Sequence, residues 1–319
     1  WLKGCFLPDI CPMGQCHCTD ACQNGTAEKV QGEPSKSVGQ ALSFLRKVPR
    51  ETRPTFTFET GATYTGDWVG SQRDGRGLQV WADGSQYEGE WQEDMAHGWG
   101  RFKCADGDVY EGHWVADQAH GRGTYHHADG SKHEGYWEHD KQCGEGTEVW
   151  ADGAQYQGHY LDGRKHGKGR FTFADGSHFE GSFENNDIHG EGRYTWVDGR
   201  TYSGQWRHNK MEGQGVFAWP DGRSFDGGYV NDMKHGNGVF RWPDGRQYDG
   251  EWREGKQHGK GQTVSASGQR RTGLWEAGKR IRWLDDDSSG MGLAGKDDKS
   301  TFPAESSLKG ADLAAGHVS

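Results

Sequence analysis

Paired glycines are the first feature of this sequence whose type and spacing could do chemistry. Gly-x-Gly recurs along the chain, for example at Gly98 and Gly100 and again at Gly236 and Gly238. Glycine-rich loops can hold phosphate groups, but a dinucleotide site requires such a loop between a strand and a helix. Here every pair lies between two expected strands. The pattern therefore favours a structural turn over a phosphate site.

Histidines precede many of these glycine pairs. They stand at His97, His120, His166, His189, His235 and His258. A column of imidazoles could bind a metal or sense pH. However, successive units of two strands would be separated by nearly 10 Å, whereas two ligand bonds of ~2 Å allow only ~4 Å between ligand atoms. We therefore interpret these histidines as structural or solvated, and we predict no metal and no cofactor.

Acidic residues also recur at matching places, which makes the polar face of the expected sheet acidic. They are Glu88, Glu90, Glu111, Glu134, Glu180, Asp226, Asp249 and Glu251. Such a face could steer a basic partner, although a solvated surface is the simpler interpretation. The net charge of -10 and the pI near 5.9 argue against nucleic-acid binding, which needs a basic face.

Catalytic motifs are absent from the sequence. The sequence has no Ser or Cys nucleophile motif, no zinc-peptidase motif and no Walker loop. The segments outside the repeats are too short for a catalytic domain. We therefore expect no enzyme activity within this chain.

Cysteines concentrate near the beginning of the chain, where five of the seven lie at Cys5, Cys11, Cys16, Cys18 and Cys22. Their spacing fits no zinc pattern. If Met13 is the initiator, Gly14 becomes an N-terminal glycine that resembles an N-myristoylation site, with Cys16 and Cys18 placed for palmitoylation. The expected Ser or Thr at the sixth position is instead Cys18. The alternative is a disordered leader with incidental cysteines.

Stable membrane anchoring needs a second signal beside one acyl chain. The cysteines could supply it, and so could a basic stretch at Arg46, Lys47, Arg50 and Arg53, which would favour anionic lipid. We therefore expect the N-terminal segment to contact a membrane.

All these residues must be positioned by a repeat with strict phase. Starting at Tyr64, a ring recurs every 23 positions at Tyr87, Tyr110, Tyr156, Phe179, Tyr202, Phe225 and Tyr248, with His133 and Arg271 as exceptions. Gly follows two residues later and another ring four residues later. The Gly-x-Gly pair and, in eight units, Asp-Gly complete the unit. A fixed period of this length is the signature of a repeat architecture.

The pattern Tyr-x-Gly-x-Trp, His-Gly-x-Gly, Asp-Gly resembles the MORN repeat family (membrane occupation and recognition nexus) from Tyr64 to about Trp283. The resemblance implies stacked β-hairpins without a catalytic site of their own. It also implies roles at junctional membranes, flagella and cell cortices, and self-association in some cases. Some members carry a separate catalytic domain, such as a plant phosphatidylinositol phosphate kinase or a lysine methyltransferase.

Turn chemistry predicts the register of each hairpin. In Trp219-Pro220-Asp221-Gly222-Arg223 a type I turn is followed by a left-handed glycine, which pairs Phe217 with Phe225 and Gly215 with Gly227. One face then carries rings and glycines, and we predict that face to be the core because each glycine leaves room for a neighbouring ring. The predicted core includes Tyr87, Trp91, Tyr110, Trp114, Trp196, Tyr202, Trp206, Trp219, Trp242, Tyr248 and Trp252.

The predicted fold class is all-β, an elongated and twisted single antiparallel sheet of stacked 23-residue hairpins. A single hairpin is marginal in water, so the units must stack to be stable. We expect a largely disordered leader over residues 1-55 with a short helix near 35-48. The repeat array then covers 56-283, with nine full units from Tyr64 and partial caps, and a disordered tail covers 284-319.

The predicted function is that of a non-catalytic scaffold that tethers a membrane to cytoskeleton or to a signalling complex. Its expected partners are other proteins, anionic lipid through the N-terminal segment, and other copies of itself. No run of about 18 apolar residues and no secretory signal is visible, so we expect an intracellular protein at the cytoplasmic face of a membrane or on the cytoskeleton. The alternative is a targeting module of a larger enzyme such as a phosphatidylinositol phosphate kinase.

Overall fold

The computed structural model describes residues 48–284, and every regular element in this range is a β-strand. Ten strands of seven residues carry the Tyr-x-Gly-x-Trp part of the repeat: β2 (Thr63–Val69), β4 (Gln86–Gln92), β6 (Val109–Val115), β8 (Lys132–Glu138), β10 (Gln155–Leu161), β12 (His178–Glu184), β14 (Thr201–Arg207), β16 (Ser224–Val230), β18 (Gln247–Arg253) and β20 (Arg270–Glu276).

Nine strands of nine residues carry the Gly-x-Gly part: β3 (Gln72–Val80), β5 (Met95–Lys103), β7 (Gln118–His126), β9 (Lys141–Val149), β11 (Arg164–Thr172), β13 (Asp187–Thr195), β15 (Lys210–Ala218), β17 (Met233–Arg241) and β19 (Lys256–Val264). The series begins with β1 (Arg50–Thr57) and ends with β21 (Lys279–Trp283).

The 21 strands form one open antiparallel sheet, which confirms the predicted fold class. The predicted register is also confirmed, because Phe217 pairs with Phe225 and Gly215 with Gly227. Strand β1 begins at Arg50, six residues before the predicted boundary at 56, since its backbone pairs with β2 from Arg50 to Thr57. The rest of the predicted leader, including the helix expected before Val48, and the tail after Leu284 lie outside the described residues.

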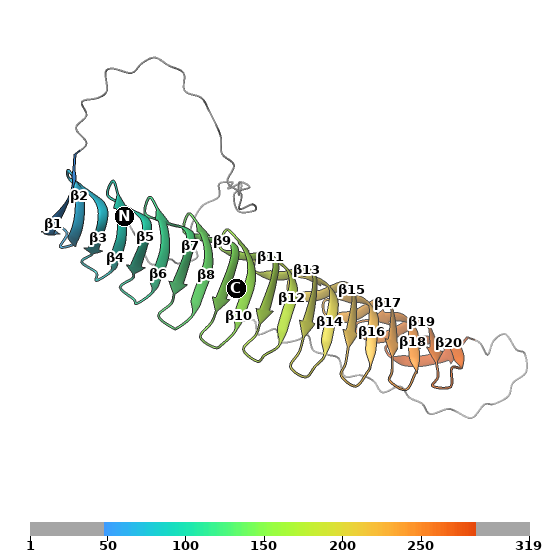
Figure 1. Ribbon diagram of the computed structural model, residues 1–319. Helices are drawn as coiled ribbons and strands as arrows, with labels where there is room; N and C mark the ends of the chain where they lie inside the picture. The colour runs from blue at the N-terminus through green and yellow to red at the C-terminus, as the bar shows by residue number, and fades with distance from the viewer. Residues whose placement is uncertain (1–47, 285–319) are drawn as a thin grey trace, which may run out of the picture. The chain divides into compact units, whose positions relative to one another are not determined.

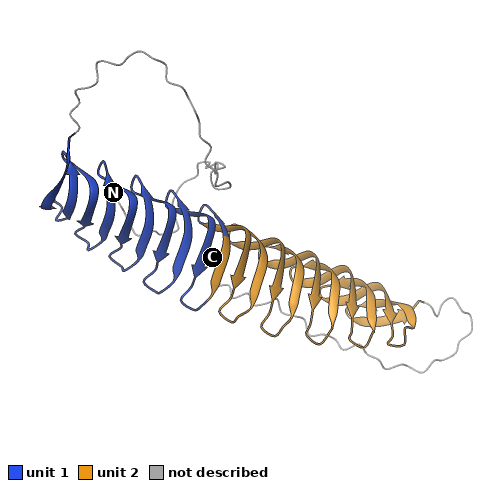
Figure 2. Ribbon diagram, in the orientation of Figure 1, with its two compact units in different colours: residues 1–153, 159–163 blue, residues 154–158, 164–319 orange. Residues whose placement is uncertain are grey.

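The described residues divide into two compact units, coloured separately in Figure 2. Unit 1 extends to Gly153 and includes His159–Gly163; unit 2 holds Ala154–Gly158 and continues from Arg164. Strand β10 contributes residues to both. Within each unit the strands follow one another in chain order (Figure 1).

Two kinds of turn alternate along the sheet. The first is the predicted three-residue loop, closed for example by Gly222 N–H donating to Trp219 O at 3.0 Å. The second is a two-residue turn that the sequence analysis missed. In nine of the ten such turns in residues 48–284 both residues have positive φ, as at Glu93 (52°) and Asp94 (71°), which defines a type I′ turn. The exception is Gly70-Ser71 between β2 and β3, where only Gly70 has positive φ. The signal was present in the sequence, because Asn, Asp or Gly occupies the second position of those nine turns.

Rings on one face form a continuous column of edge-to-face contacts within each unit. The Tyr87 ring centroid lies 5.0 Å from that of Trp91 on its own strand and 5.3 Å from that of Trp114 on β6. In unit 2 the Tyr202 ring contacts Trp206 and Tyr229 at 5.1 Å each. Each ring is therefore shared between neighbouring hairpins, which is why a single hairpin cannot bury it.

The two glycines of each Gly-x-Gly pair serve different purposes. The first, such as Gly213 with φ of 72°, adopts the left-handed backbone of a β-bulge, where the register shifts. The second faces a ring: a Cβ on Gly215 would lie 2.5 Å from two ring carbons of Tyr202. The pairs thus shape the backbone and admit rings, in agreement with the structural interpretation.

Most of the predicted core residues are buried: Tyr87, Trp91, Tyr110, Trp114, Tyr202, Trp206, Tyr248 and Trp252. Trp196, Trp219 and Trp242 differ, because each is only partly buried. These three lie at the ends of their strands, beside the three-residue loops, where the next unit covers one side of the ring only. They mark the margin of the core instead of its interior.

Candidate interaction surface

Hydrogen bonds tie the polar atoms of many buried rings to the backbone. The Tyr87 hydroxyl donates to Glu90 O at 3.0 Å, and Trp91 Nε1 donates to Gly77 O at 3.1 Å. The same two bonds recur at Tyr202 and Trp206. Burial raises the pKa of Tyr64 to about 12, which keeps its hydroxyl protonated as a donor to Asp67 O. These hydrogen bonds link the rings to the backbone of the sheet.

Cations on the core face are a feature that the sequence analysis missed; Lys165 and Lys234 are buried, and Arg73 is partly buried. Arg73, Lys165 and Lys234 occupy the same position of their units, and each cationic group lies near a ring of the core. The Lys234 ammonium is 5.1 Å from the Trp219 ring centroid and 4.7 Å from that of Phe240. The sequence held a signal for this position, because the three residues are separated by whole multiples of 23 residues and so share one place in the repeat. Cation–π attraction and a buried aliphatic stem make this position tolerable for a cation.

Three successive loops of unit 2 form a partly exposed rim, which we define as residues 196–200, 219–223 and 242–246. Each loop reads Trp-x-Asp-Gly-Arg. The Arg223 guanidinium carbon lies 5.3 Å above the Trp219 ring, and Arg223 Nε donates to Asp221 Oδ2 at 2.7 Å. The backbone N–H of Arg223 holds the pKa of Asp221 below its ordinary value. Each loop therefore presents an indole edge, a cation and a carboxylate.

Neighbouring loops of this rim touch one another. A Cβ on Gly199 would lie 3.2 Å from Pro220 Cγ, and one on Gly222 would lie 3.5 Å from Pro243 Cγ. Val197, at the corresponding place in the first loop, is 67% exposed. The rim is thus a repeated surface of apolar and charged groups, with one copy for each hairpin.

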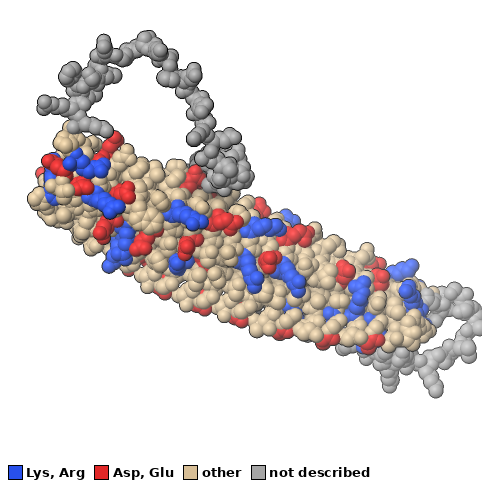
Figure 3. Space-filling model, in the orientation of Figure 1, with Lys and Arg blue, Asp and Glu red and all other residues tan. Residues whose placement is uncertain are grey.

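The polar face of the sheet, opposite the face that carries the rings, has charges of both signs. Figure 3 shows Lys and Arg interspersed with Asp and Glu on the side of the molecule that it displays. Arg101 Nε pairs with Glu111 Oε1 at 2.7 Å, and Lys132 Nζ with Glu134 Oε2 at 2.9 Å. The predicted acidic residues are therefore interspersed with cations and do not form a field of one sign. In unit 1 this face also has a hollow of about 630 Å³ beside Trp99, whose side chain is 51% exposed.

The histidines form local pairs with other side chains. His189 and His208 have ring centroids 5.3 Å apart, and His208 Nδ1 lies 2.9 Å from Asp187 Oδ2. Among residues 48–284 no three His, Cys, Asp or Glu side chains are grouped to hold a metal ion. Cys104 and Cys143 are buried.

Two residues of the predicted basic stretch are described, and both make contacts within the protein. Arg50 Nη2 pairs with Asp74 Oδ1 at 2.6 Å. Arg53 pairs with Glu51, donates to Gly70 O at 2.7 Å and lies over the Trp68 ring. Both side chains therefore help to cap the sheet. Gly14, Cys16, Cys18, Arg46 and Lys47 lie outside the described residues.

No helix within residues 48–284 is long and apolar enough to cross a membrane. This range consists of strands and turns, so the finding follows directly from the fold.

Comparison with solved structures gives only weak similarities. A mutant of the TCP10 domain of Danio rerio CPAP shares 17% identity at a TM-score of 0.36, covering 65% of this chain and 97% of that chain. The TCP domain of Drosophila melanogaster SAS-4, solved with a proline-rich motif of Ana2, shares 14% identity at a TM-score of 0.30, covering 62% and 96%. TM-scores this low say nothing about function. No curated protein matched the sequence.

The MORN repeat model, by contrast, matches nine consecutive segments. They are residues 64–86, 87–109, 110–132, 133–155, 156–178, 179–199, 202–222, 225–245 and 248–270. These segments cover more than half of the chain and keep the phase of the hairpins described above. The chain therefore belongs to the MORN repeat family.

Proposed function

We propose that this chain is a non-catalytic interaction scaffold, with the rim of unit 2 as its main protein-binding surface. The observation that supports this most strongly is the repetition of the Trp-x-Asp-Gly-Arg loop in three neighbouring hairpins with partly exposed indoles. Aromatic and arginine side chains are the types enriched at protein interfaces. The functional chemistry of the rim is therefore recognition.

A photo-crosslinking amino acid at Val197 tests this surface directly. With the full chain in cells, we expect a discrete protein crosslink from position 197. The matched control is position 216 on β15, because Val216 is also exposed but lies on the polar face. Absence of a discrete crosslink at 197, or equal crosslinks at both positions, would overturn the rim as the contact surface.

Paired tryptophan variants separate binding from folding. Trp206→Ala should cost about 3 to 5 kcal/mol, because the indole is buried and its removal leaves a cavity. Trp219→Ala should cost less, because the ring is partly exposed, and should still abolish the crosslink at 197. If Trp219→Ala unfolds unit 2 as completely as Trp206→Ala, the indole serves the core and not recognition.

The same proposal includes a membrane tether at the N-terminus, with Gly14 as the myristoylated residue and Cys16 and Cys18 as palmitoylated residues. This places the scaffold at the cytoplasmic face of a membrane or beside the cytoskeleton, with other proteins, anionic lipid or further copies of the chain as partners. Expression from Met13 with mass spectrometry of Gly14 tests the acyl chain. Flotation with anionic liposomes should compare the chain with and without residues 13–47, because deletion beyond Arg50 would remove β1.

The second candidate is a regulatory or targeting module of a larger enzyme such as a phosphatidylinositol phosphate kinase. The regular repeats are compatible with this role. The full-length transcript distinguishes the two, because a catalytic domain in the same reading frame would support the module and exclude a purely structural protein.

A further inference from the structure

Three units lack the ring that the long strand carries elsewhere in the repeat. In the other six units this ladder position holds Phe or Tyr, namely Phe102, Tyr125, Phe171, Tyr194, Phe217 and Phe240. The exceptions are Glu148, Thr263 and, in the first unit, Gln79 on β3. Its side chain is only 2% exposed. A buried amide thus replaces a buried ring.

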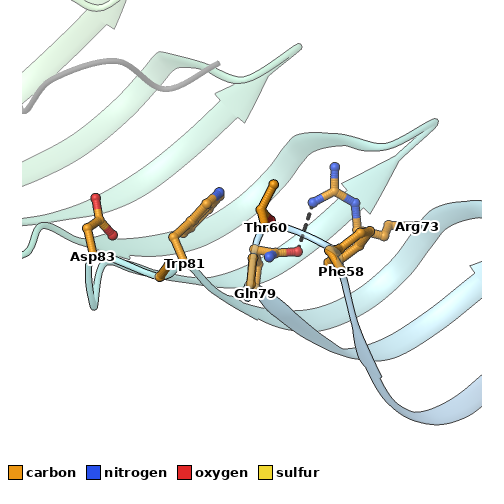
Figure 4. A pocket seen from close by; sticks show the side chains of 8 residues that line it. Phe58, Thr60, Arg73, Gln79, Trp81 and Asp83 are labelled. Atoms are coloured by element: carbon orange, nitrogen blue, oxygen red, sulfur yellow. Dashed lines mark hydrogen bonds between the residues drawn. The ribbon is translucent and has the colours of Figure 1, made fainter.

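The neighbours that such a ring would contact are still present around Gln79. In unit 2 the Tyr194 ring packs between Phe173 and Trp196, at centroid distances of 5.6 Å and 4.5 Å. The equivalent rings around Gln79 are Phe58 and Trp81. They line an open pocket of about 510 Å³ together with Gln79 and Ala62 (Figure 4). The pocket therefore occupies the space that the missing ring leaves.

The polar groups of this pocket are unequally satisfied. Arg73 Nη1 donates to Gln79 Oε1 at 3.0 Å, while Arg73 Nε and Nη2 bond Asp94. This cation is fully engaged and is a poor anion site. Gln79 Nε2, in contrast, makes no hydrogen bond within residues 48–284 and is not among the fully buried unpaired atoms, so it is open to the pocket. An amide donor that faces a pocket can bond water or an acceptor of a ligand.

Negative charge at the mouth of this pocket affects which ring-bearing ligands it can bind. Asp83 lines it, and hydrogen bonds from the Ser85 hydroxyl and backbone N–H hold the pKa of this carboxyl below its ordinary value. The carboxylate is therefore ionised at neutral pH. Glu59, next to Phe58, is also exposed. These carboxylates at the mouth of the pocket favour a ligand that carries a positive charge beside its ring.

We propose that the pocket between Phe58 and Trp81 receives an aromatic side chain from a basic segment of a partner protein. The ring would complete the aromatic ladder at Gln79, and a backbone carbonyl of the segment would accept from Gln79 Nε2. A flanking Lys or Arg would lie near Asp83. This inference rests on the proposed role as an interaction scaffold, but it concerns residues of unit 1 and not the rim of unit 2.

The test uses the full chain labelled with 5-fluorotryptophan, whose Trp81 resonance is assigned with Trp81→Phe. The probe is a synthetic peptide with one Phe between two Lys. We expect it to shift the Trp81 resonance in a saturable way, at millimolar concentration or below. The same peptide with Ala in place of Phe should cause no shift, and one with Glu flanks should bind at least tenfold more weakly.

Gln79→Phe restores the ring that other units have at this position. This variant should fold with a higher thermal midpoint and should bind the Lys-Phe-Lys peptide at least tenfold more weakly. Gln92→Phe is the matched control, since it adds the same ring at an exposed site on β4 and should leave peptide binding unchanged. No saturable Trp81 shift, or an equal shift in the Gln79→Phe protein, would overturn the pocket. Loss of the crosslink at position 197 with an intact Trp81 shift would overturn only the rim.

Discussion

At the scale of single residues, each large ring of the core lies against a glycine on the neighbouring strand. The space is limited: a Cβ on Gly215 would meet two ring carbons of Tyr202 at 2.5 Å. Neither the ring nor the backbone can move without disturbing the ladder. Glycine is therefore required at this position for space, independently of backbone conformation.

Gly215→Ala should consequently destabilise unit 2 by about 1 to 3 kcal/mol, through overpacking of the Tyr202 ring. Urea unfolding followed by tryptophan fluorescence measures the loss. Ser203→Ala is the matched control, since Ser203 lies on the opposite, exposed face of the sheet and should change stability by less than about 0.5 kcal/mol. Equal effects of the two substitutions would contradict the packing argument.

Aspartates in the type I′ turns make the stability of the folded protein depend on pH. Asp232 Oδ1 accepts from Met211 N–H at 2.8 Å, and burial raises the pKa of this carboxyl above its ordinary value of 3.8. The folded state therefore disfavours the ionised form. Stability from this group is fully present below the unfolded pKa and is lost as pH rises through the folded pKa.

Asp232→Asn should therefore stabilise the protein at pH 7 by up to about 1 kcal/mol, because the amide keeps the acceptor without the charge. Asn186 and Asn209 already make this bond at the same position in other turns. The gain should shrink as pH falls through the folded pKa and disappear below about pH 3, where Asp232 is largely protonated in both states. Unfolding at the two pH values measures it, and a gain of equal size at both would argue against a charge effect.

At the scale of the element, the type I′ turns connect each hairpin to the preceding one. Asn209 N–H donates to Ile188 O, while Asn209 Oδ1 accepts from Ile188 N–H at 2.7 Å. Three turns carry Gly in this position and keep only the backbone bond, as Gly163 does with Gln142 O at 2.9 Å. The stacking contact is therefore weaker where Gly stands.

Gly163→Asn should add the missing side-chain bond to Gln142 N–H and stabilise unit 1 by about 0.5 to 1.5 kcal/mol. The φ of Gly163 is 77°, which Asn tolerates, and a Cβ there would lie 3.6 Å from Gln142 Oε1, so it fits. Thermal unfolding measures the gain. Asn209→Gly is the reverse experiment and should destabilise unit 2; stabilisation by Asn209→Gly would refute the role of the side chain.

At the scale of the whole molecule, every strand in the described range pairs only with strands adjacent in the chain. Repeat proteins built in this way have stabilities that are approximately sums over units and their neighbour contacts. Removing one unit in phase should therefore leave the remaining hairpins able to stack. Phase matters, because a slip exchanges the two faces of a strand.

Deletion of residues 202–224 should give a folded protein with a modestly lower thermal midpoint, because Phe225 then takes the place of Tyr202 in the ladder. Deletion of 202–213 removes about half a unit and should unfold much of unit 2. Circular dichroism and tryptophan fluorescence measure both. Equal loss of structure in the two deletions would contradict the additive picture.

Much of this structure follows from local patterns. The 23-residue phase, the Asp-Gly turns and the alternation of rings with glycines predicted the hairpins, the register around Phe217 and Phe225, and the buried Tyr202 and Trp206. The type I′ turns were not predicted, because their two residues differ from unit to unit, as in Glu93-Asp94 and His208-Asn209, whereas Asp-Gly recurs unchanged. The partial exposure of Trp219 could not be predicted. The alternation of side chains along a strand tells which face of the sheet a residue occupies, but not how close the residue lies to the edge of that face.

The candidate surfaces were much less predictable. Glu111 reads as part of an acidic face, but only the folded sheet places Arg101 beside it. The sequence suggests that Arg53 is a lipid-binding cation, yet in the folded protein its guanidinium group packs over the Trp68 ring. Gln79 is unremarkable in the sequence until its buried position and missing ring neighbour are known.

By itself, the sequence determined the repeat family, the strand order and the face that becomes the core, because these depend on short-range periodicity and turn chemistry. Only the tertiary structure decided which charges are paired, which indoles remain partly exposed and where a ring-sized pocket opens. Those properties depend on contacts between residues about twenty positions apart in neighbouring hairpins, and a single unit does not contain them.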